Sequence, residues 1–305
     1  MTTTPRVIER IAELREVLDA ERAAGRRVGF VPTMGSLHEG HARLMRRARA
    51  ENEVVLVSIF VNPLQFGPSE DFAAYPRDFD RDVALCGGEE VGFVFHPSLE
   101  EMYPGRDPLK ISVGEIGEIL EGRARPGHFD GVATVVSKLF NIVGPCNAYF
   151  GEKDAQQLVV IRRLVQTLNF PVEVVCCRTV REPDGLAMSS RNVYLGPAER
   201  EAASVLLKAI EAGHRSIHEG ESDGRRVAEA MAARIRAEPL ARLDYAACVD
   251  PDTLAEAAKV DGPVLLAVAA WVGKARLIDN MTVSPAPSQD ARTGTSTVEA
   301  SITKG

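Results

Sequence analysis

The stretch Pro32-Thr33-Met34-Gly35-Ser36-Leu37-His38-Glu39-Gly40-His41 decides the fold of this chain. An apolar run at residues 28–31 precedes it and a helical pattern at residues 42–51 follows it, so the backbone must turn sharply between a strand and a helix. Gly35 and Gly40 make this turn possible, because glycine permits positive φ. The first amides of a helix have no partner inside it, so such a junction can bind an anion.

Two histidines stand at the helix end of this turn. His38 and His41 are three residues apart, so a helix beginning near them places both on one face, where they can address the same group. Imidazoles can donate hydrogen bonds to a phosphate and, when protonated, offset its charge. They could instead be surface residues beside an ordinary turn, but the strand, the glycines and the helix favour a nucleotide site.

Length and composition indicate a globular protein. The chain has 305 residues, 45% of them hydrophobic, which is enough for one large or two ordinary domains. The first residues carry no apolar targeting segment and no apolar run is long enough to span a bilayer, so we expect a cytoplasmic protein without membrane contact. A net charge of −7 argues against a nucleic-acid surface. The five cysteines include no CxxC pair and indicate buried free thiols.

Hydrophobic patterning predicts an α/β domain with a parallel sheet over residues 1–179. Residues 54–61 form an unbroken apolar, β-branched run, which is typical of a strand buried on both faces of a parallel sheet. Further strands are predicted at residues 91–95, 148–150 and 172–176, and helices at residues 8–24, 41–51, 131–143 and 155–168. The fold class expected is a Rossmann-like sheet of the nucleotidyltransferase type.

The composition and the hydrophobic pattern change in the second part of the chain. Alanine-rich helical patterns extend from residue 197 to about residue 237, and strand patterns follow at residues 243–249, 264–272 and 275–280. We predict a smaller C-terminal α+β lid domain over residues 180–283. Residues 284–305 contain few large apolar groups and are predicted to form a disordered tail.

Several other polar residues are candidates for a binding site. Gln65 follows the carboxyl end of the strand at 54–61, where open parallel sheets bind ligands, although it could equally cap its loop. The group Arg123, Arg125 and His128 could clamp a phosphate or form a solvated loop, since guanidinium groups match phosphate oxygens.

Two further segments suit phosphate chemistry. In Gly151-Glu152-Lys153-Asp154 a second strand is followed by a glycine and charges, so Lys153 could reach a phosphate, although charged helix starts are also common as surface caps. The hydroxyl and basic residues of Met188-Ser189-Ser190-Arg191 suit a loop that closes over polyphosphate, although most such loops have no special role.

Together these segments identify a family. The chain resembles pantothenate synthetases (pantoate–beta-alanine ligases) along nearly its whole length, excluding the tail. Matching motifs lie, in the family's order, at residues 31–41, 57–67, 75–77, 150–154 with 156–158, and 185–192. The paired-histidine turn alone would be less specific, because cytidylyltransferases and class I aminoacyl-tRNA synthetases share it.

The resemblance implies a two-step ligation with ATP and Mg²⁺. The pantoate carboxylate attacks the α-phosphorus of ATP to give a pantoyl adenylate and pyrophosphate, and the beta-alanine amine then displaces AMP to form pantothenate. A carboxylate is already a nucleophile, so the protein has to align the reactants and stabilise phosphate charge. We expect Mg²⁺ to be held largely by ATP phosphates and water. The resemblance also implies a homodimer.

The resemblance also implies roles for single residues. It makes His41 the proton donor, and His38 and Lys153 act with it in adenylation. Gln65 and Gln157 match the pantoate contacts, and Gln65 also lies near beta-alanine. The residues that match ATP-binding segments are Met34, Gly35, Ser36, Leu37, His38, Glu39, Gly40, His41, Gly151, Glu152, Lys153, Asp154, Val180, Met188, Ser189, Ser190 and Arg191.

Departures from the family pattern are small. Ser36 stands where alanine is commoner, and Ala155 stands where a tyrosine is often found, and neither replaces a group with assigned chemistry. Two other functions share parts of the pattern. A nucleotidyltransferase would keep the nucleotide in its product, and a non-catalytic nucleotide-binding module could dispense with the histidines and Lys153. A tRNA-charging enzyme is disfavoured by the acidic charge and by the lack of an anticodon-binding extension.

Overall fold

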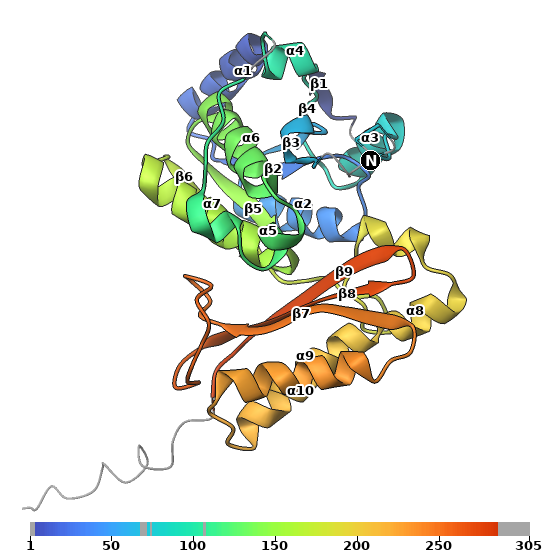
Figure 1. Ribbon diagram of the computed structural model, residues 1–305. Helices are drawn as coiled ribbons and strands as arrows, with labels where there is room; N and C mark the ends of the chain where they lie inside the picture. The colour runs from blue at the N-terminus through green and yellow to red at the C-terminus, as the bar shows by residue number, and fades with distance from the viewer. Residues whose placement is uncertain (1–3, 68–71, 74, 106–107, 286–305) are drawn as a thin grey trace, which may run out of the picture.

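A six-stranded parallel sheet forms the upper part of the molecule in Figure 1. This computed structural model describes residues 4–67, 72–73, 75–105 and 108–285. The strand order is β1-β4-β3-β2-β5-β6. The strands comprise β1 (Arg6–Ile8), β2 (Val28–Thr33), β3 (Val54–Ile59), β4 (Phe93–Phe95), β5 (Cys146–Gly151) and β6 (Val172–Cys177). The predicted parallel α/β class is confirmed.

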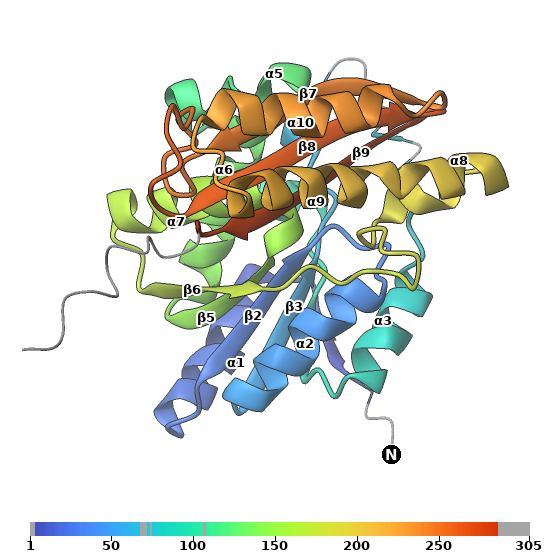
Figure 2. The same ribbon diagram turned by 90° about the horizontal axis from the view of Figure 1, so that it is seen from below.

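Helices cover both faces of this sheet (Figures 1 and 2). One face packs in a hydrophobic cluster with α1 (Ile11–Ala23), α6 (His128–Val143) and α7 (Ala155–Leu168). The other face packs with α2 (Glu39–Glu51) and α3 (Phe79–Gly88). Every residue of β3 is buried between these two layers, as its unbroken apolar run predicted. Shorter helical turns are η1 (Pro63–Gln65), α4 (Leu99–Met102), η2 (Gly114–Gly117) and α5 (Glu121–Ala124).

The first helix was predicted three residues too early. Ile8 belongs to β1, which pairs in parallel with β4 in the register Ile8 to Phe95. The reason is that Ile8 is apolar at a spacing that continues the helical pattern of Ile11 and Leu14. A three-residue edge strand is too short to display an alternating pattern of its own.

The order of the strands reverses beside β2. Gly29 of β2 pairs with Val55 of β3 on one side and with Asn147 of β5 on the other. The connections after β2 and after β5 therefore leave the same edge of the sheet in opposite directions. In open parallel sheets this arrangement opens a crevice at the carboxyl ends of the strands, and ligands bind there.

A second, antiparallel sheet forms the lower part of the molecule in Figure 1. It contains β7 (Ala241–Val249), β8 (Val264–Val272) and β9 (Ala275–Val283), and α8 (Pro197–Ala203), α9 (Val205–His218) and α10 (Gly224–Arg236) precede it. The helices α9 and α10 pack on one face of this sheet (Figure 2). The predicted α+β character of this region is confirmed.

The two sheets share a hydrophobic cluster. Tyr245, Ala247 and Leu265, on the face of the second sheet away from α9, belong to the same cluster as Phe129 and Leu158 of the first unit. The parts are therefore packed together and not merely joined by a linker. The domain boundary near residue 179 stays a prediction, and the predicted disordered tail lies almost entirely outside the described residues.

Buried ion pairs reinforce this contact. Both Nη atoms of Arg276 in β9 donate to the Glu121 carboxylate of α5, at 2.6 and 2.9 Å, and its Nε donates to Asp244 at 2.8 Å. The Arg276 and Glu121 side chains are only 12% and 14% exposed. All five cysteines are free thiols, as predicted. Within the described residues, no helix has the length and apolar character needed to cross a membrane.

Helix α6 approaches the η1 turn so closely that only glycine fits at the contact. A Cβ atom built on Gly131 would lie 2.6 Å from the Gln65 amide nitrogen. The Gly131 carbonyl accepts a hydrogen bond of 3.0 Å from Nδ2 of Asn62, just ahead of that turn. This contact fixes the position of Gln65 beside the carboxyl edge of the sheet.

We expect Gly131→Ala to displace η1 and to destabilise the protein by about 1–3 kcal/mol, because the added methyl group meets backbone that cannot rotate away. Urea unfolding measures the change. The matched control is Gly88→Ala in α3, where a Cβ would meet nothing within 4 Å. That variant should be neutral or slightly more stable. Equal stability of the two variants would contradict the close contact.

Candidate active site

A buried carboxylate holds the turn after β2 in place. Gly35 and Ser36 both adopt positive φ, at 79° and 53°, and this is unfavourable for a serine. Asp82 of α3 accepts hydrogen bonds from the amides of Ser36, at 2.8 Å, and Leu37, at 2.7 Å. Asp82 is 2% exposed, and burial raises its pKa although both amides oppose the shift. This role could not be predicted from the sequence, because Asp82 is one acid among several at the start of a helix.

The two histidines form a capping pair at the start of α2. His38 is the N-cap, and its Nδ1 accepts a hydrogen bond of 3.1 Å from the Gly40 amide. Nδ1 of His41 accepts one of 3.3 Å from the His38 amide, and the ring centroids are 4.2 Å apart. Because both Nδ1 atoms accept, the proton of each neutral ring lies on Nε2. The pair thus offers two ring N–H donors side by side.

This arrangement changes the predicted anion site. The Gly40 amide is bonded to the His38 ring, and the His41 amide is bonded to the His38 carbonyl at 2.8 Å. These two amides were expected to be available to an anion, and they are already paired. The ring Nε2–H groups, which come from the same turn, are further donors that can contact an anion.

The histidines are neutral at physiological pH. Burial first, and then the neighbouring His38 ring, lower the pKa of His41 from 6.5 to about 3. Burial and the charge of Lys153 lower the pKa of His38. The hydrogen-bonding role predicted for the rings does not need a positive charge on them. A neutral imidazole still donates a hydrogen bond, so the rings can contact a phosphate without carrying charge.

The second predicted junction lies beside the first. β5 ends at Gly151, and the turn η3 (Glu152–Asp154) leads into α7. Nζ of Lys153 is 3.9 Å from the Asp154 carboxylate, and the lysine side chain is 17% exposed. The charge of Lys153 lowers the pKa of both His38 and His41, so the two junctions form one electrostatic site. The strand reversal beside β2 brings them together.

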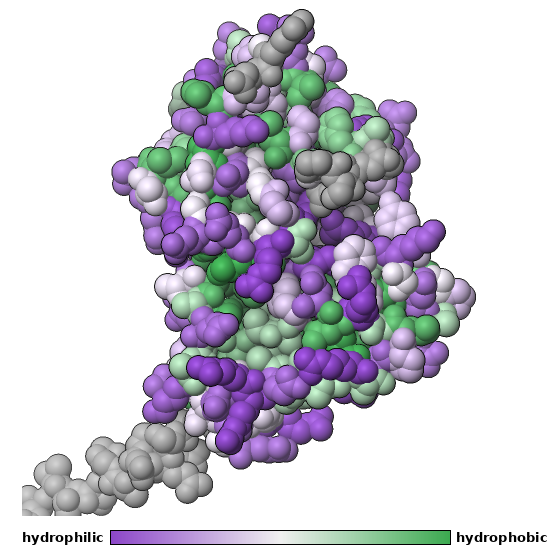
Figure 3. Space-filling model, in the orientation of Figure 1, coloured by the Kyte–Doolittle hydropathy of each residue, from purple (hydrophilic) through white to green (hydrophobic). Residues whose placement is uncertain are grey.

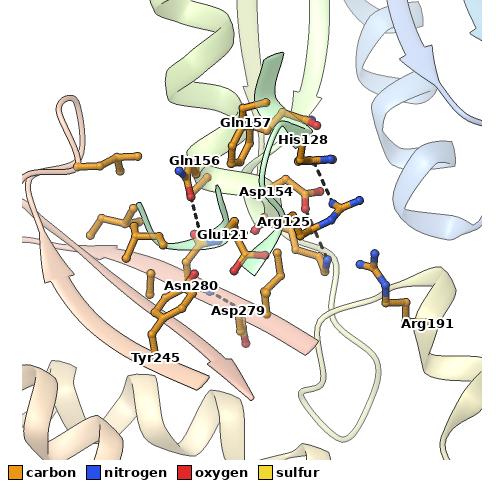
Figure 4. Close-up of a pocket in the computed structure, with 18 residues that line it drawn as sticks. Glu121, Arg125, His128, Asp154, Gln156, Gln157, Arg191, Tyr245, Asp279 and Asn280 are labelled. Carbon is orange, nitrogen blue, oxygen red and sulfur yellow. Dashed lines mark hydrogen bonds and ion pairs between the residues drawn. The ribbon is translucent and has the colours of Figure 1, made fainter. Parts of the chain in front are cut away.

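A pocket opens between the two sheets next to this junction (Figure 4). Its polar wall includes Arg125, His128, Lys153, Asp154, Gln157 and Arg191, and its apolar wall includes Phe129, Tyr245, Leu254, Leu265 and Ile278. Burial works to raise the pKa of Asp154, but Lys153 and Arg191, followed by His128 and Arg125, hold it below its ordinary value. The polar wall is thus a cluster of positive groups around one carboxylate, which suits a polyanion.

The predicted basic cluster is only partly in the site. Arg125 and His128 line the pocket, and Arg123 is exposed and lies outside it. Arg125 Nη1 lies 3.0 Å from His128 Nε2, and an arginine can only donate, so Nε2 accepts. His128 Nδ1 then donates to the Gln65 carbonyl at 2.9 Å. This chain of contacts ties the basic wall to the η1 turn.

The structure places only one of the two glutamines of the predicted substrate site in this pocket, and Gln65 lies outside its lining. Gln65 is 7% exposed; its Oε1 accepts from Asn62 at 3.1 Å, and its Nε2 lies 2.9 Å from the Met34 sulfur. Gln157 lines the pocket. Its neighbour Gln156 is instead structural, since its amide donates to the Ile116 carbonyl at 2.7 Å.

The third predicted segment forms a short hairpin. The Met188 amide donates to the Val180 carbonyl at 2.9 Å, and Arg181 pairs with Ala187. The hairpin thus brings Val180 next to Met188, and Ser189 and Ser190 lead into the turn η4 (Ser190–Tyr194). Arg191 from this turn faces the other basic residues across the pocket (Figure 4). In Figure 3 hydrophilic side chains surround the place where the upper and lower units meet.

The lowered pKa of His41 predicts acid sensitivity. Between pH 6.5 and about 3 the unfolded chain binds a proton at this residue and the folded chain does not. The lowered pKa of His41 therefore costs no stability above about pH 6.5, and it decreases the free energy of unfolding as the pH falls below that value. We expect His41→Gln to lose less stability than the unsubstituted protein when the pH is lowered from about 7 to about 4. Urea unfolding at each pH measures this, with the exposed His218→Gln as control, and parallel curves for parent and His41→Gln would contradict it.

Comparison with known proteins identifies the relatives of this chain. The sequence model of a family described as pantoate-beta-alanine ligase matches residues 6–282. A pantothenate synthetase from Roseiflexus castenholzii is 56% identical over 275 residues, covering 90% of this chain and 98% of the relative. The matched region spans both sheets.

Solved structures agree with the sequence matches. A crystal structure of pantothenate synthetase from Thermus thermophilus superposes with a TM-score of 0.86 at 50% identity, covering 92% of this chain and 100% of the other. A pantoate-beta-alanine ligase from Francisella tularensis, complexed with beta-gamma ATP and beta-alanine, gives a TM-score of 0.74 at 34% identity, covering 91% of this chain and 97% of the other.

Proposed function

The chain belongs to the pantoate–beta-alanine ligase family and joins pantoate to beta-alanine with ATP, and we propose that the site between its two sheets performs this reaction through a pantoyl adenylate. The observation that carries the proposal is the meeting of the His38–His41 pair and Lys153 at the reversal of strand order. Family membership across both sheets leaves no observation that favours a nucleotidyltransferase or a non-catalytic module.

The first step forms the adenylate. A pantoate carboxylate oxygen attacks the α-phosphorus of ATP, the bond from this phosphorus to the bridging oxygen breaks, and pyrophosphate leaves. Negative charge moves onto the phosphate oxygens, so fixed donors and cations stabilise the transition state. We assign the Nε2–H groups of His38 and His41 as these hydrogen-bond donors. Because the His41 ring is neutral, we propose that the donor role implied for it by the family is a hydrogen bond to the phosphate that gains charge. Lys153 and Arg191 supply the positive charge.

The second step forms the amide. The beta-alanine amine attacks the acyl carbon of the adenylate, AMP leaves with the acyl oxygen, and the amine gives up a proton. Alignment is the main requirement here, because the adenylate is already activated. We assign Gln65 and Gln157 to pantoate, and Gln65 also to beta-alanine, because these positions match the family's substrate contacts and Gln157 lines the pocket. The Francisella tularensis relative, complexed with beta-gamma ATP and beta-alanine, supports a site for both ligands.

The other residues proposed to bind ATP lie in the three segments described above. We propose that the turn from Met34 to His41, residues 151–154, and Val180 with Met188, Ser189 and Ser190 bind the nucleotide. Within the described residues no group of three His, Cys, Asp or Glu side chains is arranged to hold a metal. We therefore propose that Mg²⁺, which neutralises phosphate charge, enters bound to the ATP phosphates, and magnesium omission from the assay tests this.

The wider organisation is also proposed from family membership. We propose a cytoplasmic homodimer with the domain boundary near residue 179, so that the second unit, residues 180–283, closes over the first. Sedimentation at micromolar concentration tests the dimer, and a monomer there would contradict it. Limited proteolysis tests the boundary, because cleavage near residue 179 should release two resistant fragments.

Pyrophosphate release from ATP and Mg²⁺ with pantoate, with and without beta-alanine, tests the function. We expect a single-turnover burst without the amine and continuing release of AMP and pantothenate with it. A folded protein that binds ATP but releases no pyrophosphate with pantoate would exclude the proposed reaction.

The same assay tests the proposed roles of His41 and Lys153. His41→Ala and Lys153→Ala should each lower the adenylation rate by about 10²–10³-fold, because each removes a group that acts on the transition state. The matched control for the lysine is Lys208→Ala, whose side chain lies on the exposed surface of α9. Near-normal turnover of a folded His41 or Lys153 variant would remove that residue from the mechanism.

A further inference from the structure

Strand β9 presents one face to the first unit. Side chains alternate along a strand, so Arg276, Ile278 and Asn280 point the same way. Arg276 binds Glu121 of α5, Ile278 lines the pocket, and Asn280 reaches the η3 turn. Asp279 between them points to the opposite side and binds Arg181. Adjacent residues of one strand thus contact two different segments of the site.

Asn280 holds the backbone of the Lys153 turn. Its Nδ2 donates to the Lys153 carbonyl at 2.7 Å and to the Glu152 carbonyl at 3.1 Å, and the residue is 6% exposed. One amide nitrogen that bonds two successive carbonyls fixes the orientation of both peptide groups. The direction in which the Lys153 side chain leaves the turn is therefore set from the second unit.

The oxygen of the Asn280 side chain differs from its nitrogen in its contacts. Oδ1 of Asn280 is buried and has no hydrogen-bond partner within the described part of the chain. A buried polar atom without a partner costs free energy, and the two hydrogen bonds donated by Nδ2 offset this cost. Because these bonds go to the carbonyls of the Lys153 turn, the position of that turn depends on Asn280.

Asp279 holds the opposite wall of the site. Its carboxylate accepts two hydrogen bonds from Arg181, at 2.6 and 3.0 Å, and is 2% exposed. Arg181 also donates to the Gly185 carbonyl at 3.1 Å, so the hairpin that leads to Arg191 is fixed at both ends. Oδ1 of Asp279 also accepts a hydrogen bond of 2.8 Å from the backbone N–H of Asn280, which fixes the peptide group between the two residues.

We propose that Asp279 and Asn280 are positioning residues that set the spacing between Lys153 and the Arg191 hairpin. Neither touches the reacting groups; each acts through a segment that carries a cation. Because both belong to one strand, the segments that carry the two cations are held at a fixed separation on either side of the pocket. The inference rests on the proposed function, in which Lys153 and Arg191 contact those phosphates.

A double-mutant cycle tests the inference. Pyrophosphate release is measured in single turnover with saturating ATP, Mg²⁺ and pantoate for the parent, Asn280→Ala, Lys153→Ala and the double variant. We expect Asn280→Ala to lower the rate about tenfold in the parent and to have little further effect once Lys153 is absent, because it acts through that side chain. The same double-mutant cycle with Asp279→Asn and Arg191→Ala tests whether Asp279 acts through the hairpin that carries Arg191.

Matched variants separate positioning from folding. Asn147→Ala removes the hydrogen bond of 3.0 Å from its Nδ2 to Asn52, at the opposite end of β5, and should leave the rate unchanged. Asn280→Ser keeps a small polar side chain in case Asn280→Ala does not fold, and the same cycle applies to it. Thermal unfolding of every variant shows whether it is folded at the assay temperature.

The results of these measurements separate the positioning role from the ligase activity. A folded Asn280 variant with the parent rate, or one that loses the same factor with and without Lys153, would overturn the positioning role while ligase activity stands. A loss of rate that occurs only when Lys153 is present supports the positioning role. If the parent itself releases no pyrophosphate with pantoate, the proposed function fails and the positioning role fails with it.

Discussion

The reversal of strand order beside β2 is the constraint on which the site depends. Parallel strands end at the same edge, and the reversal makes the segments after β2 and β5 diverge, so backbone and side chains from both can surround one ligand. The His38–His41 pair and Lys153 are far apart in the chain and meet for this reason alone. The close contact of Gly131 with the η1 turn adds Gln65 to the same edge.

Charge in the site is divided between fixed cations and neutral donors. Burial keeps His38 and His41 uncharged by lowering the pKa of each ring, while Lys153, Arg125 and Arg191 supply positive charge around Asp154. Neutral rings avoid the cost of burying more positive charge before ATP arrives. In the proposed adenylation they offer N–H donors to the phosphate oxygens that gain negative charge.

The second unit is part of the site as well as its cover. Its sheet shares a hydrophobic cluster with the first unit, and Arg276 joins the two through a largely buried ion pair with Glu121. Asp279 and Asn280 then reach two binding segments from neighbouring positions. A strand is stiffer than a loop, so contacts made from it hold their geometry better.

The fold class, the strand–turn–helix at residues 28–51, the junction at Lys153 and the family could all be predicted from the sequence. These are local patterns: apolar runs have a period, and glycines and histidines occur at fixed spacings. The start of the first helix was misplaced, because Ile8 fits both a helix and a three-residue strand. The contacts of Asp82, Asp279 and Asn280 and the lowered pKa of His41 emerge from the three-dimensional structure. A single polar residue acquires such a role from its burial and from partners distant in the chain, and neither is written in its local sequence.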